Sequence, residues 1–180
     1  MAGIFVEFLE NKLSEQDEQL RQQLASFIKE ENIDIAVAGV QKYIMGMPVS
    51  LKIFASLVLD PQTPPDIRSY FSLVVAYLIN PENFQPEPEF KGSLLSLVDD
   101  AYLLHSSLEI VMKTLDERKR SRYSEKLKSL EPVFKFSPMV RSKLPEDTLK
   151  KLDVIINYLE KLLEVKSMAK ESLVYVLPPS

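Results

Sequence analysis

Residues 93–115 read SLLSLVDDAYLLHSSLEIVMKTL, and this stretch decides the fold. Apolar side chains return every three or four residues, the period that places them along one face of an α-helix. The positions on this seam are Leu94, Leu97, Ala101, Leu104, Leu108, Val111 and Leu115. The spacing predicts one long helix packed along its length against the rest of the chain.

A second helix is predicted immediately before it, over residues 64–79. Pro64 suits the first helical position, where its missing N–H has no partner to lose. The helix is apolar nearly all round, so we expect it to be the central element. Pro81 ends the pattern, and Pro86 keeps the connection to Gly92 from becoming helical.

The remaining segments also repeat with helical period. We expect two short helices before residue 30, helices near 34–47 and 49–59, and a last helix beginning at Pro145. Three prolines after Leu130 should divide that stretch into short pieces: Pro132, Pro138 and Pro145. Residues 116–130 are compatible with helix or loop, and residues 174–180 with a tail. The sequence therefore predicts an all-α, single-domain bundle (residues 1–180) of about seven helices with short, proline-marked connections.

Composition narrows the possible classes of protein. The formal net charge of -4 and a pI near 5.2 give no general attraction to nucleic acid, so no such partner is expected. The absence of cysteine removes disulfides and thiolate chemistry, and fits the reducing cytoplasm. The first residues do not resemble an export signal, and the longest strongly apolar run, Tyr70 to Ile79, is about half of a bilayer span. We therefore expect a cytoplasmic protein without a transmembrane segment.

The residue inventory also argues against most catalytic sites. Four scattered glycines cannot form a P-loop or a dinucleotide-binding turn. The single histidine, His105, is the only base available to a nucleophile–histidine pair, and nothing near it in sequence suggests one. We expect no catalytic residue and no cofactor.

His105, Asp99 and Asp100 lie on the long predicted helix. Glu109 stands one turn after His105, so the pair could contribute two metal ligands, but a histidine at the edge of the core, bonded to Glu109 or to a backbone carbonyl, is the favoured interpretation. Adjacent carboxylates diverge by about 100° on a helix, which favours a structural clamp over an acid–base pair. The residues that could hold a divalent cation are Glu82, Glu87, Asp99, Asp100 and His105.

The strongest local charge feature follows the long helix. Six cations lie close together: Arg118, Lys119, Arg120, Arg122, Lys126 and Lys128. An anionic membrane surface would attract them. Three acidic residues interrupt the cluster, so a solvated helix end is the favoured interpretation and a membrane contact the alternative.

Part of the chain resembles a known family. The run AYLINP at residues 76–81, the pair Pro86–Glu87, Gly92 and the run DDA at 99–101 are similar to the YkvA-like domain of unknown function. The match covers roughly residues 64–104; Asn83 and Glu87 stand where that family usually has aspartate. The resemblance implies a helix–loop–helix core with no established activity. Its characteristic positions here are Tyr77, Pro81, Asn83, Pro86, Glu87, Gly92, Asp99 and Asp100.

These observations lead to one functional hypothesis and two alternatives. The hypothesis is a non-enzymatic helical protein that acts through contacts with an unknown protein partner or with a second copy of itself. The first alternative is peripheral membrane association through residues 118–128. The second is a site for a divalent cation or small molecule around Asp99 and Asp100.

Overall fold

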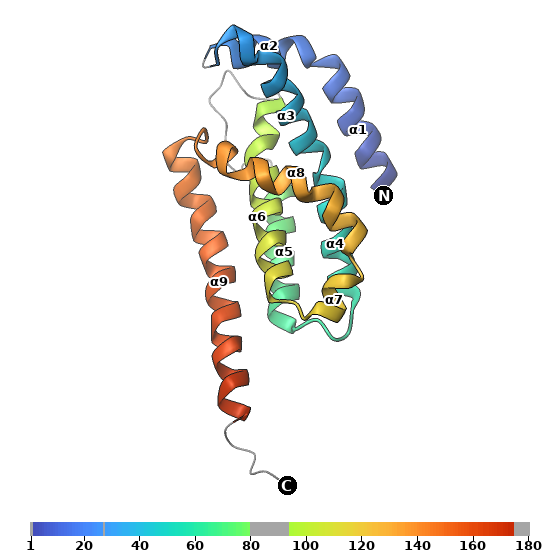
Figure 1. Cartoon of the computed structure of the whole chain (residues 1–180), viewed down its shortest axis with the longest axis vertical. Helices are drawn as coiled ribbons and strands as arrows, with labels where there is room; N and C mark the ends of the chain where they lie inside the picture. The colour runs from blue at the N-terminus through green and yellow to red at the C-terminus, as the bar shows by residue number, and fades with distance from the viewer. Residues whose placement is uncertain (1, 27, 80–93, 175–180) are drawn as a thin grey trace.

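The computed structural model describes residues 2–26, 28–79 and 94–174, and the side chains of 6–26, 28–78 and 94–164. Within these residues the protein is all-α, without strands, and its helices pack as one bundle (Figure 1). The predicted fold class is confirmed. The helices are α1 (Ala2–Glu15), α2 (Asp17–Ala25), α3 (Ile33–Met45), α4 (Met47–Leu59), α5 (Pro65–Ile79), α6 (Val98–Thr114), α7 (Glu117–Ser121), α8 (Ser124–Arg141) and α9 (Glu146–Val174), with short 3-10 turns at Glu30–Asn32 and Leu94–Leu97.

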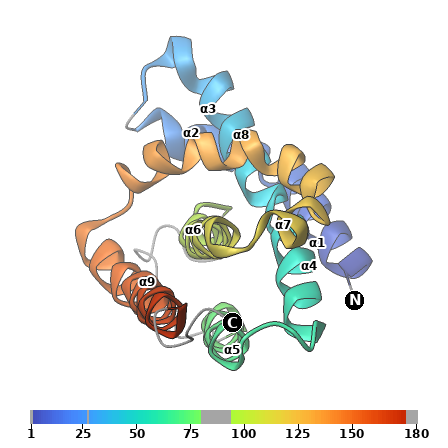
Figure 2. The same ribbon diagram turned by 60° about the horizontal axis from the view of Figure 1, so that its bottom comes forward.

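Helix α6 is the centre of the bundle. It packs against α3, α4, α5, α8 and α9, and the view in Figure 2 shows these helices arranged around it. The seam predicted from the sequence is largely buried, with Ala101, Leu104, Leu108 and Val111 at 0% exposure. The expectation that the helix over residues 64–79 is central was wrong. Its counterpart α5 leaves a face of small residues and Leu73 in solvent, so one side of α5 has nothing to bury against.

Helices α3 and α4 follow each other without a loop. Gly46 joins them in right-handed helical geometry, and Pro48 lies in the first turn of α4, where a missing N–H costs little. A Cβ atom at Gly46 would lie 3.0 Å from Val133 Cγ2, 3.1 Å from His105 Cε1 and 3.2 Å from the Tyr43 carbonyl oxygen. A side chain at this position would therefore fit only if neighbouring groups on α6 and α8 moved away by a few tenths of an ångström.

Replacing Gly46 with alanine should lower the free energy of unfolding by about 1–2 kcal/mol, through crowding against these three neighbours. In an open helical position the same change would stabilise by up to about 1 kcal/mol, so the sign of the effect is informative. Urea unfolding followed by circular dichroism measures it, with the exposed Lys52→Ala on α4 as control. A stabilised Gly46→Ala protein would contradict the close packing.

The prediction that Pro132 and Pro138 divide the stretch after Leu130 into short pieces was wrong. Residues 117–121 form the short α7, and α8 then runs unbroken through Pro132 and Pro138. Both prolines are exposed, whereas Leu130, Val133, Ser137 and Val140 on the same helix are buried. The carbonyl groups that lose a partner therefore lie on or near the solvent side, where water can replace the missing hydrogen bond.

Helix α9 begins where the sequence predicts. Its buried face carries Leu152, Ile156 and Leu159. Arg141 of α8 makes two hydrogen bonds to the Asp153 carboxylate, at 2.6 and 2.7 Å, and a third to the Tyr102 hydroxyl at 2.7 Å, which joins α8, α9 and α6. The helix continues to Val174 and runs past the end of the bundle (Figure 1); the rest of the predicted tail, residues 175–180, lies outside the described residues.

Candidate functional site

His105 is completely buried where α6 crosses the junction of α3 and α4. Its Nε2 lies 2.9 Å from the Tyr43 carbonyl oxygen, and its Nδ1 lies 2.9 Å from the Ser50 hydroxyl. A carbonyl oxygen can only accept, so Nε2 carries the proton and Nδ1 accepts from Ser50. Burial lowers the pKa of His105 to about 4, against a partial opposing effect of the bond to Tyr43. The imidazole is therefore neutral at neutral pH.

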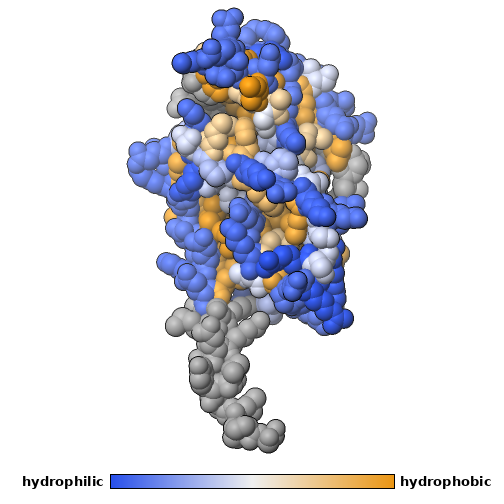
Figure 3. Space-filling model, viewed as in Figure 1, coloured by the Kyte–Doolittle hydropathy of each residue, from blue (hydrophilic) through white to orange (hydrophobic). Residues whose placement is uncertain are grey.

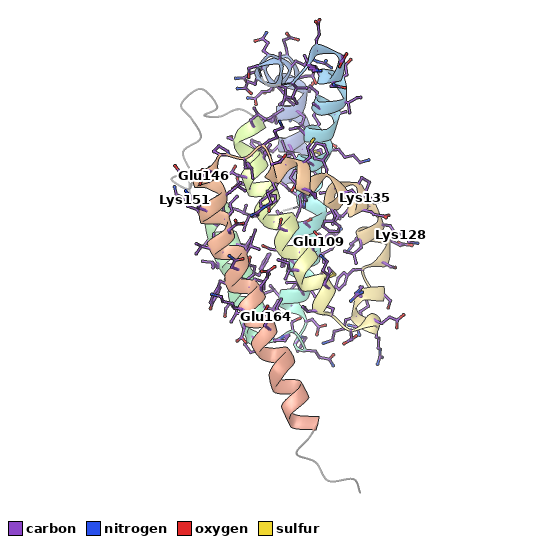
Figure 4. The ribbon with its side chains drawn as sticks, turned by 60° about the vertical axis from the view of Figure 1, so that its left-hand side comes forward. Glu109, Lys128, Lys135, Glu146, Lys151 and Glu164 are labelled. Atoms are coloured by element: carbon purple, nitrogen blue, oxygen red, sulfur yellow. The ribbon has the colours of Figure 1, made fainter. Side chains whose placement is uncertain are left out.

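This geometry removes His105 from the candidate metal ligands. Both ring nitrogens are used, and no lone pair remains for a cation. The sequence left two possible partners for His105, Glu109 and a backbone carbonyl; in the structure His105 bonds to a backbone carbonyl, that of Tyr43. Glu109 instead forms an ion pair with Lys113 at 2.9 Å and lies on the part of α6 seen between α9 and α8 (Figure 4).

Ser50 was not singled out from the sequence, and its contact with His105 resembles a nucleophile–base pair. Both side chains have 0% exposure, so no substrate reaches the hydroxyl. The pair therefore joins α4 to α6. A second buried chain of hydrogen bonds runs from the Tyr43 hydroxyl to Ser137 (3.0 Å) and from the Ser137 hydroxyl to the Val133 carbonyl (3.3 Å).

Asp99 and Asp100 occupy the first turn of α6. Asp99 accepts a long hydrogen bond, 3.4 Å, from the Tyr77 hydroxyl. Burial raises the pKa of Asp99 to about 6, and burial followed by the charge of Asp99 raises the pKa of Asp100 to about 8. Two carboxyl groups with raised pKa values on one helical turn indicate that the fold holds them at a cost in stability.

Arg68, the cation considered from the sequence as a partner for this pair, is used elsewhere. Its guanidinium donates to the backbone carbonyl groups of Thr63 (3.1 and 2.9 Å) and Pro61 (2.9 Å) in the turn before α5. It therefore stabilises that turn rather than neutralising Asp99 or Asp100.

The other residues of the predicted site cannot be placed. Pro81, Glu82, Asn83, Pro86, Glu87 and Gly92 lie outside the described residues. Across residues 2–26, 28–79 and 94–174, no group of three or more histidine or acidic side chains is arranged to hold a metal ion. The structure brings Tyr77, Asp99 and Asp100 together and leaves His105 in a different environment.

The basic segment folds partly back on the protein. Arg122 pairs with Asp60 at 3.6 Å, and Lys119 approaches the Gln62 carbonyl at 3.5 Å. Arg120 donates to two carbonyl groups at the end of α6, those of Lys113 (3.2 Å) and Leu115 (3.0 Å). Three of the six cations thus stabilise the junction between α6, α7 and the end of α4.

A shallow surface hollow lies between α1 and α3. It is lined by Leu13, Ser14, Asp17, Ala38, Gln41, Lys42 and Met45. The carboxylate of Asp17 accepts from Arg21 at 2.8 Å and from Gln41 at 2.7 Å, and Arg21 also pairs with Asp34. These contacts hold α2 against α3, so helix packing explains the polar groups of the hollow and no ligand is needed to explain them.

One helical stretch among the described residues, Glu30–Leu59, is long and apolar enough to cross a membrane by length and composition. Half of its most apolar window is buried inside the bundle, as in the core helices of many soluble proteins. This stretch is therefore only weak evidence for a membrane span, and the expectation of no transmembrane segment stays a prediction.

The fold and the buried contacts define an all-α helical bundle whose internal polar groups serve mainly to join helices. Comparison of the chain with protein-family models, curated proteins and solved structures finds no match in any of the three. The resemblance to the YkvA-like domain therefore stays a prediction.

Proposed function

We propose that the protein is a non-catalytic helical module that acts through contact with another protein chain, and that the outer face of α9 is the contact surface. The observation that carries the proposal is the exposure of Val154 (70%) and Tyr158 (52%). They stand four residues apart, one turn along the face opposite the buried Leu152 and Ile156. Tyrosine is enriched at protein interfaces because it combines a large apolar ring with a polar end.

The surroundings of this pair fit a small contact. Helix α5, which packs against α9, has an exposed apolar residue of its own, Leu73, at 42% exposure. On the face shown in Figure 3, hydrophilic side chains divide the apolar ones into small areas, so no broad apolar surface covers this side of the bundle. A contact surface built on two exposed apolar side chains supports a transient interaction, of the class that buries less than about 1,200 Å² in total.

A photo-crosslinking amino acid at position 158 tests the proposal in cells that produce the protein. We expect crosslinked protein adducts at position 158, and a loss of most of them when Val154→Glu is added. An adduct with twice the 20.6 kDa mass would identify a second copy of the chain, and any other mass a different protein.

The matched control places the same crosslinker at Ile35 of α3, which is 72% exposed and lies outside α9. Equal adduct formation at positions 35 and 158, or adducts at 158 that Val154→Glu leaves unchanged, would contradict the proposal. Circular dichroism of each variant confirms that the bundle is folded.

A further inference from the structure

The tertiary structure places an exposed leucine beside the basic segment. Leu59, the last residue of α4, has 80% of its side chain exposed, the highest value among the large apolar residues described. The residues that follow it contact α7 and the residue after it: the Gln62 carbonyl lies 3.5 Å from Lys119 Nζ, and Asp60 pairs with Arg122. Figure 1 shows α7 next to the connection between α4 and α5.

The charge of the basic segment, residues 116–128, is asymmetric. Residues 116–128 carry six cations and three anions. One of the anions, Asp116, accepts a hydrogen bond from the Lys119 backbone N–H at 2.8 Å and so caps α7. Within the described part of the chain, Arg118, Lys126 and Lys128 have no ion-pair partner.

From this arrangement we infer that the end of α4, α7 and the first turns of α8 together form a peripheral docking surface for an anionic lipid bilayer. An exposed apolar side chain next to a chain segment that contacts a basic segment matches the interface of such a bilayer, where the leucine enters the headgroup region and the cations meet lipid phosphates. A polyanion without an apolar phase would not account for the exposed leucine.

The shape of the bundle restricts how a bilayer can approach. Helix α9 runs past the same end of the bundle as α7, and the two helices lie on opposite sides of α6 in Figures 1 and 2. A membrane that contacts Leu59 therefore approaches from the α7 side. This surface is separate from the proposed protein contact on α9, so each can fail without the other.

Vesicle co-sedimentation tests the inference with the full chain. We expect binding to phosphatidylcholine vesicles that contain phosphatidylserine, weakened by salt, and little binding to phosphatidylcholine alone. Removing one cation near an anionic surface weakens partitioning about fivefold, so Arg118→Ala and Lys126→Ala should each have this effect and the double variant a larger one. Leu59→Ser should weaken binding to the same vesicles with every cation in place.

Two controls keep the result specific. Ile35→Ser removes a similarly exposed apolar side chain from another part of the bundle, and Lys150→Ala removes an exposed cation from α9. Neither should change vesicle binding. The inference is overturned if the wild-type protein does not sediment with anionic vesicles, if Leu59→Ser binds them as well as wild type, or if the controls weaken binding as much as the test variants.

Discussion

Replacing His105 with alanine is expected to lower the free energy of unfolding by about 3–5 kcal/mol, the largest effect of a single substitution anticipated here. The change empties a completely buried ring position at the crossing of α6 with α3 and α4. It also leaves the Tyr43 carbonyl without the imidazole donor and the Ser50 hydroxyl without its acceptor. Guanidinium unfolding followed by circular dichroism measures the loss.

Glu109→Ala provides the control for this measurement. Glu109 lies one turn further along α6, and its partner Lys113 is mostly exposed, so the change should cost no more than about 0.5 kcal/mol. A loss below about 1 kcal/mol for His105→Ala would show that the buried hydrogen bonds contribute little to stability.

The pH dependence of stability gives an independent check on His105. Its pKa is about 4 in the folded protein and near 6.5 in the unfolded chain. Between these values the unfolded chain binds the proton more tightly, so this contribution to stability is present above about 6.5 and falls as the pH is lowered towards 4. The difference in stability between wild type and His105→Ala should shrink over this window, by about 3 kcal/mol at most. A difference independent of pH would contradict the buried, neutral imidazole.

The second large effect has the opposite sign: replacing Asp100 with asparagine should stabilise the protein. Burial and the neighbouring Asp99 raise the pKa of Asp100 to about 8, from 3.8 for an ordinary aspartate. Between pH 3.8 and about 8 the folded protein binds the Asp100 proton more tightly than the unfolded chain does. The stability that this protonation contributes is therefore present at low pH and is lost as the pH rises through about 8. Asparagine removes the charge, and we expect a gain of about 2 kcal/mol above the folded pKa, discounted because the side chain is partly exposed.

The comparison of Asp100→Asn with wild type at low and high pH decides this prediction. The gain should vanish near pH 4, where the wild-type carboxyl group is protonated in the fold. Asp147→Asn, a first-turn aspartate of α9 whose side chain is 91% exposed, should change stability little at either pH. If Asp100→Asn is instead less stable than wild type at high pH, the carboxylate has a favourable partner, and a cation at this turn becomes the better interpretation.

Sequence periodicity predicted most of the helices of this fold, but not the unbroken α8. The apolar seam of residues 94–115 predicted a long, buried helix, which the structure has as α6 over Val98–Thr114, after a 3-10 turn at Leu94–Leu97. The stripe through Leu152, Ile156 and Leu159 predicted the inward face of α9. Periodicity succeeds because an apolar face must be buried wherever the helix finally packs. The residue inventory also identified His105, Asp99 and Asp100 as titratable groups on the long helix α6; the structure buries His105 completely and leaves Asp99 and Asp100 partly exposed.

Only the tertiary structure decided how these elements are combined. The prolines of α8 are tolerated because they face solvent, and α6 rather than α5 is central because neighbours surround it on all sides. The partners of His105, Ser50 and Tyr43, stand 55 and 62 residues away in the chain. The residues directly after the exposed Leu59 lie beside the basic segment because Asp60 and Gln62 contact Arg122 and Lys119. A helical period specifies which face of each helix turns inward, whereas the identity of the facing residue depends on packing between segments far apart in sequence.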